Sequence, residues 1–206
     1  LTIKISIQLN HSSFQIKSLN LKLLINTMKR ISRFILCTIL GWKIVNDFPK
    51  EIKKYVVVAA PHTSWVDFPI AILFRKSLGV KINFIGKASL FKPPFGFFFR
   101  AFGGSPVNRS ESANLVDAII NLFNEKNEFR LALSPEGTRK KVEQWKTGFY
   151  YIAKGANVPI VMATLNFGKK ELKVSEPFYT TDNQKKDFDF FYAYYKGVKG
   201  MYPSKS

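Results

Sequence analysis

The amino-acid sequence predicts an α/β fold, in which a mostly parallel sheet has helices on both faces and is preceded by an N-terminal amphipathic helix. Two observations predict it. Short apolar runs rich in β-branched residues, typical of buried strands, alternate with segments whose apolar residues recur at helical spacing. The chain has 206 residues, 46% of them hydrophobic, so it can bury a substantial core and is not a disordered tail.

The clearest expected strand is 55–60, which is wholly apolar and ends at Pro61. The other expected strands are 81–86, 105–109, 129–134 and 159–166, with a further edge strand at 170–174. Helices are expected at 68–78, at 112–126 and at 144–154, and glycines at 79 and 155 would end the first and the last of them. In such a sheet, ligands bind beyond the carboxyl ends of the strands.

The chain divides into a leader over 1–27, a membrane-docking helix over 28–45 and a functional domain over 46–206. The leader contains three Lys and no acid, Gly or Pro. We expect it to be poorly ordered or not native, and a short helix at 14–24 is the alternative. The apolar run 34–42 is too short to cross a bilayer, which takes about 20 residues. Because Lys29, Arg30 and Trp42 flank it, we expect an amphipathic helix on a membrane surface, with a buried helix as the alternative.

The charge is strongly positive, with 32 Lys and Arg against 14 Asp and Glu. This favours an anionic partner such as nucleic acid, an acidic membrane, a phosphorylated substrate or an acidic carrier protein. The 20 phenylalanines fit a lipid surface better than a nucleic-acid groove. One Cys and two His exclude a disulfide framework and a multi-cysteine metal site. We expect neither a metal nor another cofactor.

His62 and Asp67 follow the first strand, five residues apart. In a loop that folds back, the carboxylate can orient the imidazole and leave its other nitrogen free to take a proton from a substrate hydroxyl. Alternatively, Asp67 merely starts the next helix, because Ser64 and Asp67 match a capping box.

The segment Pro-Glu-Gly-Thr-Arg at 135–139 follows the fourth strand. Gly137 offers a flexible backbone, Thr138 a hydroxyl, and Arg139 a guanidinium suited to bidentate phosphate binding. Arg109 is a second candidate phosphate ligand. The alternative is a solvated turn with a Glu–Arg ion pair.

A Phe-rich stretch at 90–102 has two prolines and Gly96, which prevent a long helix. Either it is buried under the sheet, or it lines an apolar groove and touches a membrane. We expect a groove that includes Phe95 and Phe98.

In their order, the segments 62–67, 87–109, 135–139 and 158–161 resemble the glycerophospholipid acyltransferase family, and above all its 1-acylglycerol-3-phosphate acyltransferases. The resemblance implies that His62 is a general base oriented by Asp67. It further implies that Arg109, Glu136, Gly137 and Arg139 bind the acceptor's phosphate or shape its pocket. Residues 158–161, among them Pro159 and Ile160, would help to hold the acyl group.

The implied reaction moves a fatty acyl group from an acyl-CoA or acyl-carrier-protein thioester to a lyso-phospholipid hydroxyl. The expected partners are that donor, the acceptor and an anionic membrane, at whose cytoplasmic face the protein would be peripheral or monotopic, and they do not include nucleic acid. Asn108 stands where the family usually has an acid, which leaves open another lyso-lipid as acceptor. The alternative from another class is a non-catalytic basic module that binds membranes or nucleic acid.

Overall fold

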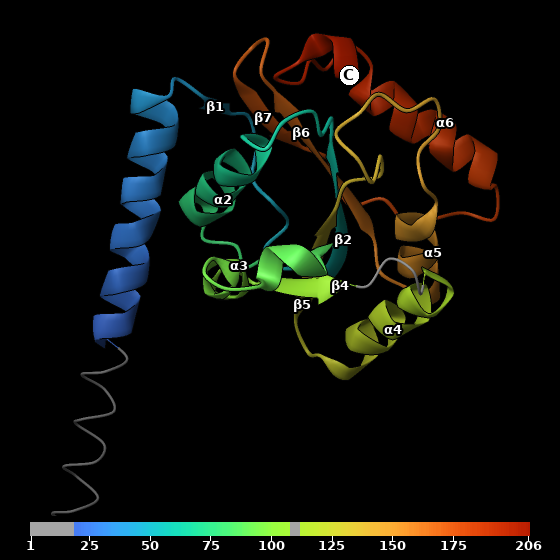
Figure 1. The fold of residues 1–206 in the computed structure, drawn as a ribbon, viewed down its shortest axis with the longest axis horizontal. Coiled ribbons are helices and arrows are strands. Elements are labelled where there is room, and N and C mark those ends of the chain that lie inside the picture. The colour runs from blue at the N-terminus through green and yellow to red at the C-terminus, as the bar shows by residue number, and fades with distance from the viewer. Residues whose placement is uncertain (1–18, 108–111) are drawn as a thin grey trace, which may run out of the picture.

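A computed structural model describes residues 19–107 and 112–206, and its α/β fold confirms the predicted class (Figure 1). Across the described residues, the sheet has seven strands in the order β1-β7-β6-β2-β5-β3-β4. Neighbouring strands are parallel except β6 and β7, which are antiparallel. The strands are β1 (Lys43–Ile44), β2 (Lys54–Ala60), β3 (Asn83–Lys87), β4 (Gly104–Val107), β5 (Phe129–Leu133), β6 (Ile160–Asn166) and β7 (Glu171–Val174).

The sheet separates two cores, because successive residues of a strand point to opposite faces. Val56, Val58 and Ala60 of β2 belong to the core shared with α4 (Ser112–Glu125), α5 (Gly148–Gly155) and α6 (Gln184–Tyr195). Tyr55 and Val57 belong to the other core, with α2 (Asp67–Leu78) and the π-helical turn η1 (Phe34–Ile39). Figure 1 shows α2 on one side of the strands and α4 to α6 on the other.

The site is positioned by the ends of β2 and β5. The two strands are parallel neighbours, with Val58 paired to Leu133, so the loops that follow them emerge at the same edge of the sheet. This places the loop after Ala60 next to the loop after Leu133.

The N-terminal segment is helical where the structure describes it. Residues 19–33 form one helix that continues through η1, so Met28 lies inside a helix. A short helix within 1–27 was the alternative expected for the leader, and 19–27 are helical. Ser32 and Leu36 are buried against the body of the protein, whereas most side chains of this helix are exposed. Trp42, expected at a membrane surface, is only 5% exposed and packs edge-on against Phe167. No helix within the described ranges is both long and apolar enough to cross a membrane.

Neither β1 nor α6 was among the predicted elements. β1 is only two residues long and pairs with β7 at the sheet edge. Helix α6 begins after Asn183, whose side chain accepts a hydrogen bond from the Lys186 N–H and caps the helix. Phe188, Phe191 and Tyr195 of α6 face the core. Aromatic residues also occupy positions 190, 192 and 194, so the helical spacing of the core-facing side chains does not stand out in the sequence.

Candidate active site

His62 and Asp67 form a hydrogen-bonded pair at the carboxyl end of β2. The Nδ1 atom of His62 lies 2.9 Å from the Oδ2 atom of Asp67, the first residue of α2. Because an ionised carboxylate only accepts hydrogen bonds, Nδ1 carries the proton and Nε2 is left as a proton acceptor. The imidazole side chain is 34% exposed, and no hydrogen bond to its Nε2 atom exists among the described residues. The Nε2 atom is therefore available to accept a proton.

Asp67 also organises the loop between β2 and α2. Its Oδ2 atom accepts hydrogen bonds from the backbone N–H groups of Thr63 and Ser64, each at 2.9 Å. The carboxylate lies at the N-terminus of α2, where a negative charge is favourable. Its Oδ1 atom is buried and has no partner within the described part of the chain. Asp67 thus both starts the helix and orients the imidazole. The two alternatives that the sequence left open for Asp67 therefore do not exclude each other.

Glu136 lies behind the histidine. Its carboxylate accepts hydrogen bonds from the backbone N–H of His62, at 2.9 Å and 3.2 Å, and from the Ser134 hydroxyl. Burial raises the pKa of Glu136 above its ordinary value, although these hydrogen bonds and His62 oppose the rise. Its carboxylate therefore joins the loop after β5 to the backbone of His62.

Residues 199–206 brace the same loop from the other side, which the sequence did not indicate. The Thr63 hydroxyl accepts a hydrogen bond from the backbone N–H of Tyr202, at 3.2 Å. Gly200 packs so closely that a Cβ atom there would lie 2.5 Å from the Thr63 side chain. The backbone carbonyl of Lys199 accepts a bond from the Phe167 N–H, at 2.8 Å. Thr63 is thereby fixed on both sides.

The turn after Glu136 carries exposed cationic side chains. Gly137 has a φ angle of +64°, and the Lys146 side chain lies against it. The Thr138 hydroxyl accepts a bond from the Lys140 N–H, at 3.3 Å. The exposed Arg139 makes no ion pair or hydrogen bond within residues 19–107 and 112–206. The alternative interpretation, a Glu–Arg ion pair, is therefore not seen there. Arg109 and Asn108 lie outside the described residues.

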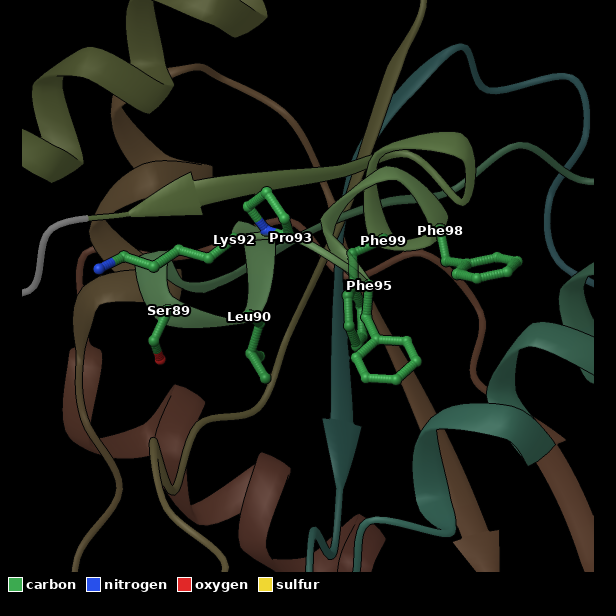
Figure 2. Close-up of a pocket in the computed structure, with 7 residues that line it drawn as sticks. All are labelled: Ser89, Leu90, Lys92, Pro93, Phe95, Phe98 and Phe99. Atoms are coloured by element: carbon green, nitrogen blue, oxygen red, sulfur yellow. The ribbon is translucent and has the colours of Figure 1, made fainter.

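The residues predicted to hold the acyl group do not come together. Phe95 and Phe98 line an open pocket of about 410 Å³ with Ser89, Leu90, Lys92, Pro93 and Phe99 (Figure 2). Pro159 and Ile160 are instead buried where β6 begins. Ile160 pairs with Val56, four residues before the end of β2, and lies in the core shared with α5 and α6.

No three His, Cys, Asp or Glu side chains come together to hold a metal ion in the part of the chain that the structure describes. The chemistry available to the site is proton transfer at His62, with exposed cationic groups on the adjacent turn. A histidine–carboxylate pair at the carboxyl edge of an open α/β sheet is suited to an enzyme that deprotonates a substrate hydroxyl.

Comparison with known proteins agrees with this class. The sequence profile of the Acyltransferase family matches residues 43–165, more than half of the chain, and the protein belongs to that family. Its fold is similar to the crystal structure of PlsC, the 1-acyl-sn-glycerophosphate (LPA) acyltransferase from Thermotoga maritima. The TM-score is 0.54 at 23% identity, over 81% of this chain and 75% of that one. No curated protein matches the sequence.

Proposed function

We propose that this protein transfers a fatty acyl group from an acyl-CoA or acyl-carrier-protein thioester to the hydroxyl of a lyso-glycerophospholipid. The first candidate acceptor is 1-acylglycerol-3-phosphate. The observation that carries the proposal is the His62–Asp67 pair, whose Nε2 atom is free to accept a proton. Membership of the acyltransferase family and the fold shared with a 1-acyl-sn-glycerophosphate acyltransferase support the substrate class.

In the proposed mechanism, His62 acts as a general base. Its Nε2 atom takes the proton of the acceptor hydroxyl while the hydroxyl oxygen attacks the thioester carbonyl. A carbon–oxygen bond forms, the carbon–sulfur bond breaks, and the departing thiolate recovers the proton from the imidazolium. Asp67 holds the ring and stabilises its charged form, as the carboxylate of a catalytic triad does.

The acceptor's phosphate would bind near Arg139, beside the Thr138 hydroxyl. Both side chains are exposed on the turn that follows Glu136, and Glu136 bonds the backbone of His62. A guanidinium with no acidic partner among the described residues is available for a two-point contact with phosphate. Glu136 itself contacts His62 and Ser134, so its proposed role is to shape the site rather than to bind the phosphate.

The proposed site of action is an anionic membrane surface. The helix over 19–33 and η1 expose large apolar side chains: Leu19, Leu21, Leu23, Leu24, Ile25, Met28, Ile31, Phe34 and Ile39. Lys22, Lys29, Arg30 and Arg33 lie among them, and the helix contains no acid. An apolar surface flanked by cations suits a helix that lies in the interface of an anionic bilayer.

The direct test uses purified protein with palmitoyl-CoA or palmitoyl-acyl carrier protein and a panel of lyso-lipids. Release of free thiol and formation of the diacyl product are followed for each pair. We expect thiol release that requires an acceptor, with 1-acylglycerol-3-phosphate giving the highest kcat/KM. Salt-sensitive nucleic-acid binding without consumption of any thioester would contradict the proposal.

A further inference from the structure

We propose that the aromatic segment 88–102 is a second membrane contact, which places the side chains of Leu90, Phe95, Phe97 and Phe98 in the interface of an anionic bilayer. The segment consists of the 3-10 helix η2 (Ala88–Phe91), a proline turn and α3 (Gly96–Ala101). It is separate in sequence from the N-terminal helix. The role of this contact in catalysis rests on the proposed function, in which the acceptor is a membrane lipid. The contact itself can be measured without turnover.

The first observation is a concentration of exposed apolar side chains. Leu90 is 46% exposed, Phe95 63%, Phe97 61% and Phe98 49%. Figure 2 shows Leu90 and Phe95 projecting on the same side of the segment. A contiguous apolar patch on a protein surface marks an interaction site, and aromatic side chains suit the boundary between water and lipid.

The second observation is the charge around the patch, which decides between partners. Lys87, Lys92 and Arg100 are exposed on this segment or directly before it. Between Asp67 and Glu111 the sequence contains seven Lys or Arg and no acidic residue. Cations around an apolar surface, without acids, complement the headgroups of an anionic bilayer. The uniform positive charge also opposes pairing with a second copy of the same surface.

The third observation is that other residues of the segment anchor it to the body of the protein. Phe91 is buried, and Phe99 packs against both Phe91 and Phe68. The guanidinium of Arg100 donates to the Phe91 carbonyl, at 2.9 Å, and that of Arg75 donates to the Phe102 carbonyl, at 2.5 Å. The outward-facing side chains are therefore presented by a rigid platform rather than by a flexible loop.

The platform also adjoins the candidate active site. Phe68 follows Asp67 in the first turn of α2, and its ring centroid lies 5.5 Å from that of Phe99. Trp65, in the loop between His62 and Asp67, is 69% exposed. A bilayer bound to the platform would therefore lie close to the catalytic pair, where a lyso-lipid acceptor could reach it from the membrane.

A change at Phe97 can distinguish contact with a membrane from binding of an acyl chain in the pocket. Phe95 and Phe98 line the pocket between η2 and α3, but Phe97 does not. A loss caused by changing Phe97 therefore reports contact with lipid outside the pocket. Phe97 packs on Phe98, with a ring-centroid distance of 3.9 Å, and is otherwise open to solvent, so its replacement should leave the fold intact.

The test measures sedimentation of the full chain with vesicles of phosphatidylcholine alone or mixed with phosphatidylglycerol. Phe97→Ser should lower the partition coefficient on the anionic vesicles about fivefold or more, because an aromatic side chain is lost from the interface. Phe97→Trp should retain binding, and brominated lipids should quench its fluorescence more than that of the unsubstituted chain. The matched control is Leu122→Ser, on α4, where Leu122 is also exposed; it should not change the partition.

Unchanged partition of Phe97→Ser, or an equal loss in Leu122→Ser, would overturn the inference. The inference would also be overturned if Phe97→Ser bound vesicles normally but were slower only with acyl carrier protein as donor. In that case the platform would bind the carrier protein rather than the bilayer. Activity on a dispersed short-chain lyso-lipid is measured in parallel. The unsubstituted protein could fail to transfer acyl groups while Phe97→Ser still weakens vesicle binding. That result would disprove the proposed function but would support the membrane contact.

Discussion

The Nδ1 atom of His62 lies 2.9 Å from the Oδ2 atom of Asp67, and the same oxygen accepts two backbone N–H groups of the intervening loop. One carboxylate oxygen therefore fixes both the fold of the loop and the orientation of the ring. Asn and Ala at this position should separate the two roles.

Asp67→Asn should keep the fold and lose activity. The amide oxygen can occupy the place of Oδ2 and accept the same three hydrogen bonds, but the charge that stabilises a protonated imidazole is gone. We expect kcat to fall about 10²-fold or more, with the KM for the thioester little changed. Asp67→Ala should also lower the free energy of unfolding, by about 1–3 kcal/mol for each backbone N–H left buried without a partner. Equal stability of the two variants in urea would contradict this division of roles.

The buried carboxylate of Glu136 predicts a pH-dependent stability. Because burial raises its pKa above the ordinary value, the folded state binds the proton more tightly than the unfolded state. Its contribution to stability is therefore greatest below the unfolded pKa and falls as the pH rises through the folded pKa. Glu136→Gln removes this titration but keeps the shape and leaves the nearby His62 and Asp67 in place. The free energy of unfolding of the unsubstituted protein minus that of the variant should fall as the pH rises from about 4. A difference that rises with pH would refute the account of Glu136.

Gly200 should not accommodate a side chain without strain, because a Cβ atom would lie 2.5 Å from Thr63, the residue after His62. Gly200→Ala should cost about 1–3 kcal/mol of stability and lower kcat more than either KM, since the loop that carries His62 must shift. Gly148→Ala is the matched control, because its Cβ would meet no atom within 4 Å. Adding Thr63→Ser, which removes the crowded methyl group but keeps the hydroxyl, should restore part of kcat. No restoration, or an equal effect in the control, would contradict bracing by residues 199–206.

The N-terminal helix should bind membranes through residues that precede Met28. Leu23 and Leu24 are 66% and 58% exposed, so the double change Leu23→Ser with Leu24→Ser should weaken binding to anionic vesicles without changing the thermal unfolding temperature. This prediction gives a role to part of the segment 1–27, which the sequence alone suggests is a poorly ordered or non-native leader. Removing all residues before Asn46 would be a poor test, because Leu36 and Trp42 belong to the core. Binding that survives the double change would place the membrane contact elsewhere.

The sequence was sufficient where one segment determines its own structure. The wholly apolar run of β2 could only be a buried strand, and Gly79, with φ of +70°, ends α2 where predicted. The sequence also led to His62 and Asp67, because they lie only five residues apart, on either side of one short loop. Glu136 and Tyr202 contact that loop from 74 and 139 residues away, and no local pattern indicates such contacts. Trp42 shows the converse: its sequence neighbours suit a membrane helix, but its ring packs on Phe167 from the β6–β7 turn.

The most direct test of the central claim is acceptor-dependent thiol release by the unsubstituted protein and by His62→Ala. The variant should fold normally, because the contact with Glu136 uses the backbone N–H of residue 62 rather than its side chain. With palmitoyl-CoA and 1-acylglycerol-3-phosphate, we expect rapid release by the unsubstituted protein and a rate about 10²–10⁴-fold lower for the folded variant. A folded His62→Ala protein that transfers acyl groups at the full rate would show that His62 is not the base.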